Sequence, residues 1–433
     1  MKTVKFGGTS LADARQIRKA AQIVRADEER CYVVVSAPGK RQRLDVKVTD
    51  LLYRAYDEYL AQKDYRQVLV RVGDRFNAIA DELNVEIDVA KEIETIAQNI
   101  EAGRDYIASR GEYLSAKIFA SYLGYGFVDA KDCVFFERGR LNEEKTYDAI
   151  NTILSRLDRV VIPGFYGSDE TGRIRTFSRG GSDITGSLVA RAMRCDVYEN
   201  WTDVNGLLCA DPRVVDDPIT MDYVSYDELR ELSYMGASVL HEDAVFPCRQ
   251  AGIPIHIRNT DHPEIQGTII GHEKQKQKMV LGIAGKKGFS NIQIEKSLMN
   301  SEIGFGARVL GILADHHISY EHAPTSVDTM SVLVTSDQLK HDRDRLIDEI
   351  KDKLSPDFIA IEDGLALVAV VGAGFGSVGF AASLLREVAQ AGVNVRCIVA
   401  GFSGMSLIIG VNEDEFELCM RSLYDGMIHK GQG

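Results

Sequence analysis

The stretch VKFGGTSLADA (residues 4–14) couples a short apolar run to two glycines and then to an amphipathic pattern. Apolar residues recur at helical spacing from Leu11 to Val24, so the sequence predicts a strand, a glycine turn and a helix. Ser10 can cap that helix, with Asp13 three residues later. The turn is a candidate phosphate site, because glycine amides approach anions closely and a helix N-terminus carries partial positive charge. The alternative is an ordinary strand-to-helix turn.

A second succession of strand, glycines and helix occurs in TFSRGGSDITGSL (176–188). Ser182 is expected to cap this helix, with Asp183 in its first turn and Arg179 just before the glycines. Two glycine turns at helix N-termini can face one phosphate chain from both sides. Lys5, at the first turn, can follow a transferring phosphoryl group as a point charge.

Short β-rich runs alternate with amphipathic helices as far as about residue 285. Further examples of such runs are CYVVVSA (31–37), RVVIPGF (159–165) and DVYENWTD (196–203). Buried strands alternating with helices predict an α/β sandwich with a mainly parallel sheet.

The polar stretch GHEKQKQKM (271–279) is interpreted as a linker, and the pattern then changes to β-α-β-β-α, repeated after roughly seventy residues. The second copy contains VAVVGAGFGSVGFAASLL (368–385), which includes G-x-G-x-x-G. A dinucleotide site would need an acidic residue at the end of the next strand, and VNVRCIVAG has none. The duplicated unit instead resembles the ACT domain, a small sensor of free amino acids.

Composition is that of an ordinary globular protein of 433 residues, with 45% apolar and 27% charged residues. A formal net charge of −13 argues against a nucleic-acid binder. Seven dispersed cysteines without a C-x-x-C pair suggest a reducing compartment. The sequence has no signal-peptide pattern and no apolar run of membrane-spanning length, so we expect a cytoplasmic protein without a membrane partner. Its nine histidines lack metal-ligand spacing, and we expect no protein metal site.

The stretch SRGEYLSAKIFASYL (109–123) places Glu112 at an expected helix start. Glu112 then either completes a capping box with Ser109 or faces a ligand.

The stretch WTDVNGLLCADPRVV (201–215) is rich in turn residues after a strand. Its Asp203, Asp211 and Arg213 either line a cleft or make local Asx turns and surface pairs.

Taken together, VKFGGTS, VVVSA, SRGE, TFSRGGSD, WTDVNGLLCADPRVV and MGASVLH resemble, in this order, the motifs of aspartate kinases in the amino acid kinase family. With the two ACT-like copies the resemblance covers nearly the whole chain, and it is closest to the single-function, lysine-sensitive type. It implies a three-layer α/β sandwich followed by two ferredoxin-like ACT domains. The implied boundaries are a catalytic domain at 1–285, a regulatory ACT domain at 286–360 and a second, dimerising one at 361–433.

The resemblance implies that ATP, with Mg²⁺ riding on its phosphates, phosphorylates the side-chain carboxylate of L-aspartate to 4-phospho-L-aspartate. This is the first step of lysine, threonine and methionine biosynthesis. A carboxylate nucleophile is ionised at neutral pH and needs no general base. The implied catalytic residues are Lys5 and Asp183, and the implied substrate-binding residues are Thr49, Glu112, Arg179, Gly181 and Ser182. The implied ATP-binding residues are Lys5, Gly7, Gly8, Thr9, Ser36, Thr202, Asp203, Leu208, Arg213, Ser238 and Val239.

Two positions depart from the family pattern: Ser238 stands where a lysine is usual, and Leu208 where an aromatic residue is frequent. The basic insertion GKRQRLDVK could supply a replacement cation from its Lys40, Arg41 or Arg43. We favour the simpler interpretation of this insertion as a solvated, mobile surface loop.

The first ACT copy is implied to bind the feedback inhibitor. The matching positions are Met299, Ser301, Gly304, Phe305, Ser319, Tyr320, Glu321, Thr325 and Ser326. Glu321 replaces an aspartate of the lysine-sensitive type, while Met299 and Phe305 could equally be core residues. Lysine is the expected inhibitor, with threonine as the alternative, and paired ACT domains imply a homodimer or a dimer of dimers. The rival functions are a kinase for another small acid, such as glutamate, and an amino-acid-sensing regulator with an inactive kinase half.

Overall fold

The computed structural model describes residues 1–178, 180–237, 240, 242–272, 279–400 and 404–429. Most of the expected linker at 271–279 therefore lies outside the described residues. The chain divides into two compact units, which we describe separately. The first comprises Met1–Leu207, Thr220–Tyr226 and Ser238–Lys274, and the second Leu208–Ile219, Asp227–Ala237 and Gln275–Gly433. Among the described residues, no helix has the length and apolar character needed to cross a membrane.

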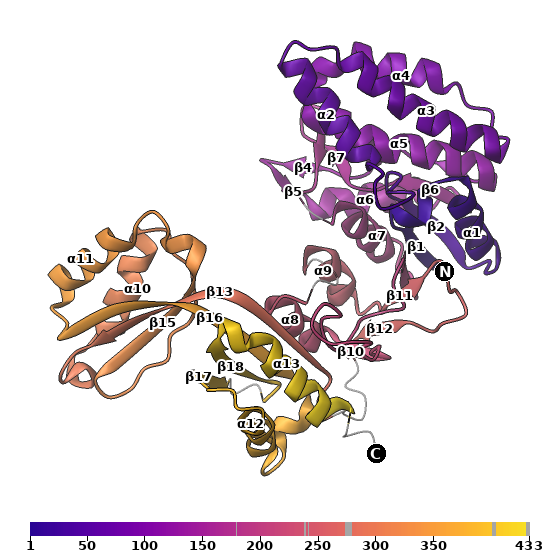
Figure 1. Cartoon of the computed structure of the whole chain (residues 1–433). Coiled ribbons are helices and arrows are strands. Elements are labelled where there is room, and N and C mark those ends of the chain that lie inside the picture. Colours follow the sequence, from indigo (N-terminus) through magenta and orange to yellow (C-terminus); the bar gives the residue numbers. More distant parts are fainter. Residues whose placement is uncertain (179, 238–239, 241, 273–278, 401–403, 430–433) are drawn as a thin grey trace. The chain divides into compact units, whose positions relative to one another are not determined.

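A sheet of eight strands forms the centre of the first unit, in the order β10-β12-β11-β9-β1-β2-β6-β3 (Figure 1). The strands are β1 (Lys2–Phe6), β2 (Arg30–Val35), β3 (Gly126–Phe127), β6 (Val160–Pro163), β9 (Val197–Thr202), β10 (Tyr223–Ser225), β11 (Ile255–Asn259) and β12 (Thr268–Gly271). All neighbours are parallel except β11 and β12. The mainly parallel sheet predicted from the alternating pattern is thus confirmed.

Helices cover both faces of this sheet. Because successive side chains of a strand point to opposite faces, Val4 and Phe6 of β1 lie on one face and Lys5 on the other. Val4 and Phe6 join a core built with α1 (Ala14–Arg25), α2 (Val48–Leu60), α3 (Tyr65–Leu83), α4 (Val89–Gln98) and α5 (Arg104–Leu123). Lys5 instead meets α7 (Gly181–Ala192) on the opposite face. The three layers expected of the sandwich are therefore present.

Smaller elements complete the first unit. They are the helices α6 (Glu143–Leu154) and α9 (Glu242–Ala251) and the hairpins of β4 (Phe136–Glu137) with β5 (Arg140–Leu141) and of β7 (Tyr166–Ser168) with β8 (Ile174–Thr176).

The carboxyl ends of three central strands stand level with one another. Phe6 of β1 is in register with Val35 of β2 and with Trp201 of β9. The residues that follow these strands therefore meet at one edge of the sheet, where ligands of open parallel sheets bind. This edge carries the glycine turn that begins at Gly7.

The second unit contains a single antiparallel sheet in the order β14-β15-β13-β16-β18-β17 (Figure 1). Its strands are β13 (Gly282–Glu295), β14 (Tyr320–His322), β15 (Thr329–Thr335), β16 (Phe358–Val371), β17 (Cys397–Ala400) and β18 (Ser406–Asn412). The unit's helices are α10 (Phe305–Asp315), α11 (Arg343–Leu354), α12 (Phe380–Gln390) and α13 (Phe416–Tyr424), together with most of α8 (Tyr226–Tyr234). The boundaries expected after residues 285 and 360 fall inside β13 and β16, which pair along most of their length.

Packing and turn geometry explain two of the three glycines of the G-x-G-x-x-G stretch. A Cβ on Gly374 would lie 2.5 Å from the Phe380 ring. Gly379 caps α12 with φ +84°, a conformation that favours glycine. The preceding strand, β16, belongs to an antiparallel sheet, unlike the parallel unit of a dinucleotide fold. The structure thus gives Gly374 and Gly379 roles in packing and in the turn before α12.

Candidate active site

Lys5 and Asp183 form an ion pair on the sheet face below α7. The Lys5 Nζ lies 2.6 Å from Oδ1 of Asp183, and the Lys5 side chain is only 9% exposed. Asn200 donates from Nδ2 to the same Oδ1 at 2.8 Å. Lys5 and Asn200 are register partners on the adjacent strands β1 and β9, so their side chains emerge side by side. The first strand and the helix after the second glycine turn thus meet at one ion pair.

The glycine turn after β1 is held by backbone contacts. The Gly7 N–H donates to the Trp201 carbonyl at 3.0 Å, and the Gly8 carbonyl accepts from the Gly39 N–H at 2.7 Å. A Cβ on Gly8 would lie 2.8 Å from the Ala37 carbonyl oxygen, so the close approach of two chain segments requires glycine here. The phosphate interpretation of Gly8 is therefore not needed to explain why it is glycine.

The helix that follows this turn starts later than expected. Residues Thr9–Leu11 form a short 3-10 helix, and α1 begins at Ala14 with Asp13 as its N-cap. The Asp13 side chain accepts from the Gln16 N–H at 2.9 Å. Capping of this helix by Ser10 was wrong, because the Ser10 hydroxyl bonds to Thr260 at 2.7 Å.

Among the described residues, no side chain caps the N-terminus of α7. The N-cap is Gly180, with φ +58°, so the expectation that Ser182 would cap the helix was wrong. Asp183 lies in the first turn, as predicted. The uncapped N–H groups of this turn are suited to an anion. Arg179 lies outside the described residues.

Glu112 is a buried carboxyl group with an unsatisfied oxygen. It sits in the middle of α5 and not at a helix start, so both the predicted start and the capping box were wrong. Ser109 donates its hydroxyl to the Tyr106 carbonyl at 2.7 Å instead. Burial raises the pKa of Glu112 from 4.5 to about 8, opposed by a backbone hydrogen bond from Ala37 and by the charge of Arg110. Its Oε2 is buried without a hydrogen-bond partner among the described residues, an arrangement suited to a cationic ligand group.

The first turn of α2 packs on α5 beside Glu112. A Cβ on Gly111 would lie 3.4 Å from the Val48 side chain and 2.7 Å from that of Ala37. Thr49, the next residue of α2, is half-buried in this turn. Thr49 and Glu112, which the resemblance assigns to the substrate, thus lie on two helices that are in contact.

The remaining residues expected at the nucleotide are spread over both units. Ser36 follows β2, and Thr202 ends β9 and donates to Asp203 at 3.2 Å. Leu208 and Arg213 belong to the second unit. There Asp211 accepts from the Arg213 backbone N–H at 2.9 Å and pairs with its guanidinium at 2.6 Å, as expected of an Asx turn with a surface pair. Ser238 and Val239 lie outside the described residues.

Three residues that support the site were missed from the sequence: Asn200, Gly39 and Arg75. Asn200 could have been found, because it is a polar residue within an apolar strand and stands opposite Lys5 when the two strands are paired. Arg75 interrupts the apolar face that Val72 and Phe76 form on α3, which is also visible in the sequence. Gly39 had no signal, because its contact is with a residue distant in the sequence.

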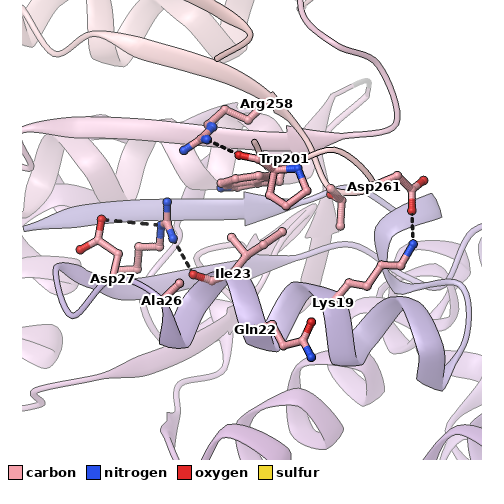
Figure 2. A pocket seen from close by; sticks show the side chains of 11 residues that line it. Lys19, Gln22, Ile23, Ala26, Asp27, Trp201, Arg258 and Asp261 are labelled. Atoms are coloured by element: carbon pink, nitrogen blue, oxygen red, sulfur yellow. Dashed lines mark hydrogen bonds and ion pairs between the residues drawn. The ribbon is translucent and has the colours of Figure 1, made fainter. Parts of the chain in front are cut away.

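A cavity of about 640 Å³ lies beside α1, and neither Lys5 nor Asp183 lines it (Figure 2). Arg258 stacks over the Trp201 ring at 4.5 Å and donates from Nη2 to the Pro263 carbonyl at 2.6 Å. Lys19 pairs with Asp261 at 2.5 Å. Lys19 and the Nη2 of Arg258 thus have partners in the cavity wall, while the buried Nε of Arg258 has none among the described residues. We assign the cavity no ligand.

The expected effector residues fall into two groups. Met299 and Phe305 are buried in the core of the first repeat, so their side chains serve packing. The others are exposed or half-buried: Ser301, Gly304, Ser319, Tyr320, Glu321, Thr325 and Ser326. Glu321 accepts a hydrogen bond from the Tyr234 hydroxyl of α8, within the second unit.

Within the described ranges, no group of three or more His, Cys, Asp or Glu side chains could hold a metal ion.

Comparison with known proteins places this geometry in a family. The model of the amino acid kinase family matches residues 2–259, and an ACT domain model matches residues 368–427. Aspartokinase 3 of Bacillus subtilis is 38% identical to the chain, covering 98% of each.

Solved structures agree with this result. Clostridium acetobutylicum aspartate kinase matches with a TM-score of 0.92 and 43% identity, covering 99% of this chain and 100% of that one. Escherichia coli aspartokinase III matches over 99% of both chains in two states. Its complex with aspartate and ADP gives a TM-score of 0.77 at 25% identity, and its complex with lysine and aspartate gives 0.72 at 26%. The chain therefore belongs to the amino acid kinase family, as one of its aspartate kinases.

Proposed function

We propose that this aspartate kinase transfers the γ-phosphoryl group of ATP to the side-chain carboxylate of L-aspartate, yielding 4-phospho-L-aspartate and ADP. The observation that carries the proposal is the Lys5–Asp183 pair. It lies at the first turn of α7, close to the edge of the sheet where β1, β2 and β9 end in register. The complex of the E. coli relative with aspartate and ADP supports the same substrates.

To catalyse phosphoryl transfer to a carboxylate, the protein must position the two substrates and neutralise the negative charge on the phosphate oxygens. Lys5 is the cation that would contact the transferring group, and Asp183 with Asn200 would fix its ammonium in place. The N–H groups of Gly8 and Thr9 would hold the phosphates from the other side, whereas the Gly7 N–H is already donated to the Trp201 carbonyl. The described partners of the Asp183 carboxylate, Lys5 and Asn200, both contact Oδ1, so Oδ2 would be the oxygen that faces the hydration shell of Mg²⁺ on the phosphates.

Aspartate would bind between α2, α5 and the start of α7. The unsatisfied oxygen of Glu112 would accept the substrate ammonium, and Thr49 would add a hydroxyl from the adjoining turn. Gly181 and Ser182 would offer backbone N–H groups at the helix end, and Arg179 would bind a substrate carboxylate in a bidentate manner. The remaining ATP contacts proposed from the resemblance are Ser36, Thr202, Asp203, Leu208, Arg213, Ser238 and Val239.

Hydroxylamine trapping tests the reaction. Acyl phosphates react with hydroxylamine to give hydroxamates, so ATP with aspartate should yield a coloured ferric hydroxamate in step with ADP release. Glutamate and N-acetylglutamate should yield far less; preference for either would identify a different small-acid kinase. Absence of any trapped product would favour a regulator with an inactive kinase half.

Regulation by lysine is the second part of the proposal. We propose that residues 286–360 form a regulatory ACT domain and 361–433 a second one, that lysine binds the first, and that the enzyme is at least a homodimer serving lysine, threonine and methionine biosynthesis. Glu321 carries the lysine assignment: it is a half-buried carboxylate whose partner is a neutral hydroxyl, so a ligand ammonium is a stronger partner for it. The E. coli relative with lysine and aspartate supports this effector.

Replacing Glu321 with alanine is expected to raise the lysine concentration for half-inhibition at least about tenfold, because a charge-assisted hydrogen bond is lost. Turnover without lysine should stay within about twofold of wild type, because the residue lies in the regulatory repeats. The measurement is a lysine titration of ADP release at fixed aspartate. Tyr234→Phe removes the same contact but keeps the carboxylate, and should preserve inhibition. Equal lysine curves for Glu321→Ala and wild type would place the effector elsewhere.

A further inference from the structure

One buried arginine anchors the basic insertion at residues 39–47 to the segment that follows β1. Arg75 of α3 has a side chain only 5% exposed and donates from Nη1 to Asp45 Oδ2 at 2.8 Å. Its Nη2 donates to the carbonyls of Ala12, at 3.0 Å, and of Gly39. One guanidinium thus joins the insertion to the segment that follows β1. Residues 40–44 are exposed, as expected of a surface loop, while these contacts anchor the loop at Gly39 and Asp45.

Asp45 also stabilises the conformation of the insertion through contacts with Arg41. It accepts from the Arg41 backbone N–H at 3.0 Å and from the Arg41 guanidinium at 2.8 and 3.2 Å. Both Arg41 and Arg75 hold the pKa of the Asp45 carboxyl well below its ordinary value. Arg41 is consequently engaged within the loop and is not available to a ligand.

The head of the insertion lies directly against the turn of residues 7–10. The Gly39 N–H donates to the Gly8 carbonyl at 2.7 Å, and a Cβ on Gly39 would stand 2.6 Å from the Gly8 carbonyl carbon. Lys40 follows Gly39 immediately and is exposed. In the part of the chain that the structure describes, Lys40 has no ion-pair partner.

The charge balance at the turn calls for a second cation. Lys5 is paired with Asp183, so the pair together contributes no net charge toward a triphosphate. Catalysis of phosphoryl transfer depends on neutralising the charge on the phosphate oxygens. Lys40 stands next to the contact between Gly39 and Gly8, on a flexible stem with three rotatable donors.

We propose, resting on the function proposed above, that Lys40 contacts the phosphates of bound ATP and that Arg75 is a positioning residue that presents it. Arg75 holds residues 39–47 against the turn, so the backbone at Lys40 is fixed next to the phosphates. The Lys40 ammonium neutralises charge that the Lys5–Asp183 pair leaves uncompensated.

Steady-state kinetics on the full chain test the assignment. Lys40→Ala is expected to raise the KM for ATP about tenfold, with the KM for aspartate within about twofold, because one charge-assisted contact to phosphate is lost. The increase should shrink at high salt, since an exposed cation is screened. Arg43→Ala, the same charge change in the same exposed loop, is the matched control and should leave both constants near wild type. Equal KM values for ATP in Lys40→Ala and Arg43→Ala would overturn the role of Lys40.

A double-variant cycle tests the positioning role. Arg75→Gln should also raise the KM for ATP about tenfold, and adding Lys40→Ala to it should change that constant less than about twofold, because the two residues act through one contact. Fully multiplicative effects would overturn the role of Arg75. If Arg75→Gln does not fold, Asp45→Asn loosens the same anchor and takes its place in the cycle. A wild-type enzyme that forms no hydroxamate would refute the proposed function itself, whereas an active wild type with unaffected variants would refute only this inference.

Discussion

Replacing Lys5 with methionine is expected to lower kcat about 100- to 1000-fold, while the KM for aspartate changes less than about threefold. Methionine keeps most of the apolar stem and removes only the ammonium that stands 2.6 Å from Asp183. The lost interaction is one that strengthens as charge develops on the transferring phosphoryl group, so kcat suffers most. The measurement is coupled ADP release with ATP and aspartate varied in turn.

Folding of this variant needs its own control. Lys5→Met leaves the Asp183 carboxylate beside a buried methionine, and an uncompensated charge there destabilises the fold. The double variant Lys5→Met with Asp183→Asn removes both charges and should melt near wild type while staying as slow as Lys5→Met. A single variant that melts normally and keeps kcat within about threefold of wild type would contradict the role of Lys5.

The affinity for aspartate is expected to rise with pH by up to about tenfold per unit below pH 8 and to level off above it. Burial raises the pKa of Glu112 to about 8, so the carboxyl is mostly protonated at pH 7 before substrate binds. Pairing with the substrate ammonium requires the ionised form, and binding therefore releases a proton. Calorimetry in buffers of different ionisation enthalpy should detect nearly one proton released per aspartate at pH 7.

Glu112→Gln should remove this pH dependence and raise the KM for aspartate about 30- to 300-fold, because a buried charged partner of the ammonium is lost. The KM for ATP should stay within about threefold of wild type. Stability gives an independent readout. The unfolded chain ionises Glu112 above pH 4.5, whereas the folded chain holds the proton to about pH 8, so this group destabilises the fold increasingly between those values. The variant should therefore melt at or above the wild-type temperature at pH 8; an unchanged pH profile of aspartate binding would contradict the assignment.

The sheet and the central pair of the site were predictable from local sequence. The apolar run ending at Phe6 and the turn residues around Asp183 each carry a strong local signal, and the rule that ligands meet at strand ends brings them together. The alternating pattern gives the mainly parallel sheet, and the repeated β-α-β-β-α pattern, through its resemblance to the ACT domain, gives the duplicated unit.

Helix boundaries and long-range contacts were less predictable. Ser10 and Ser182 are both favoured N-caps, but tertiary contacts engage the first, and a left-handed Gly180 takes the cap position of the second helix. Ser109 and Glu112 match a capping box by spacing alone, yet α5 begins at Arg104. Contacts such as those of Arg75 join segments far apart in the sequence, and no local pattern contains their partners.

A crystal structure with a non-hydrolysable ATP analogue and aspartate tests the central claim most directly. We predict phosphate oxygens within hydrogen-bonding distance of the Lys5 ammonium and of the N–H groups of Gly8 and Thr9, with the aspartate ammonium on Glu112. Nucleotide bound among the repeats beyond residue 286, with the turn after β1 free of phosphate, would contradict it.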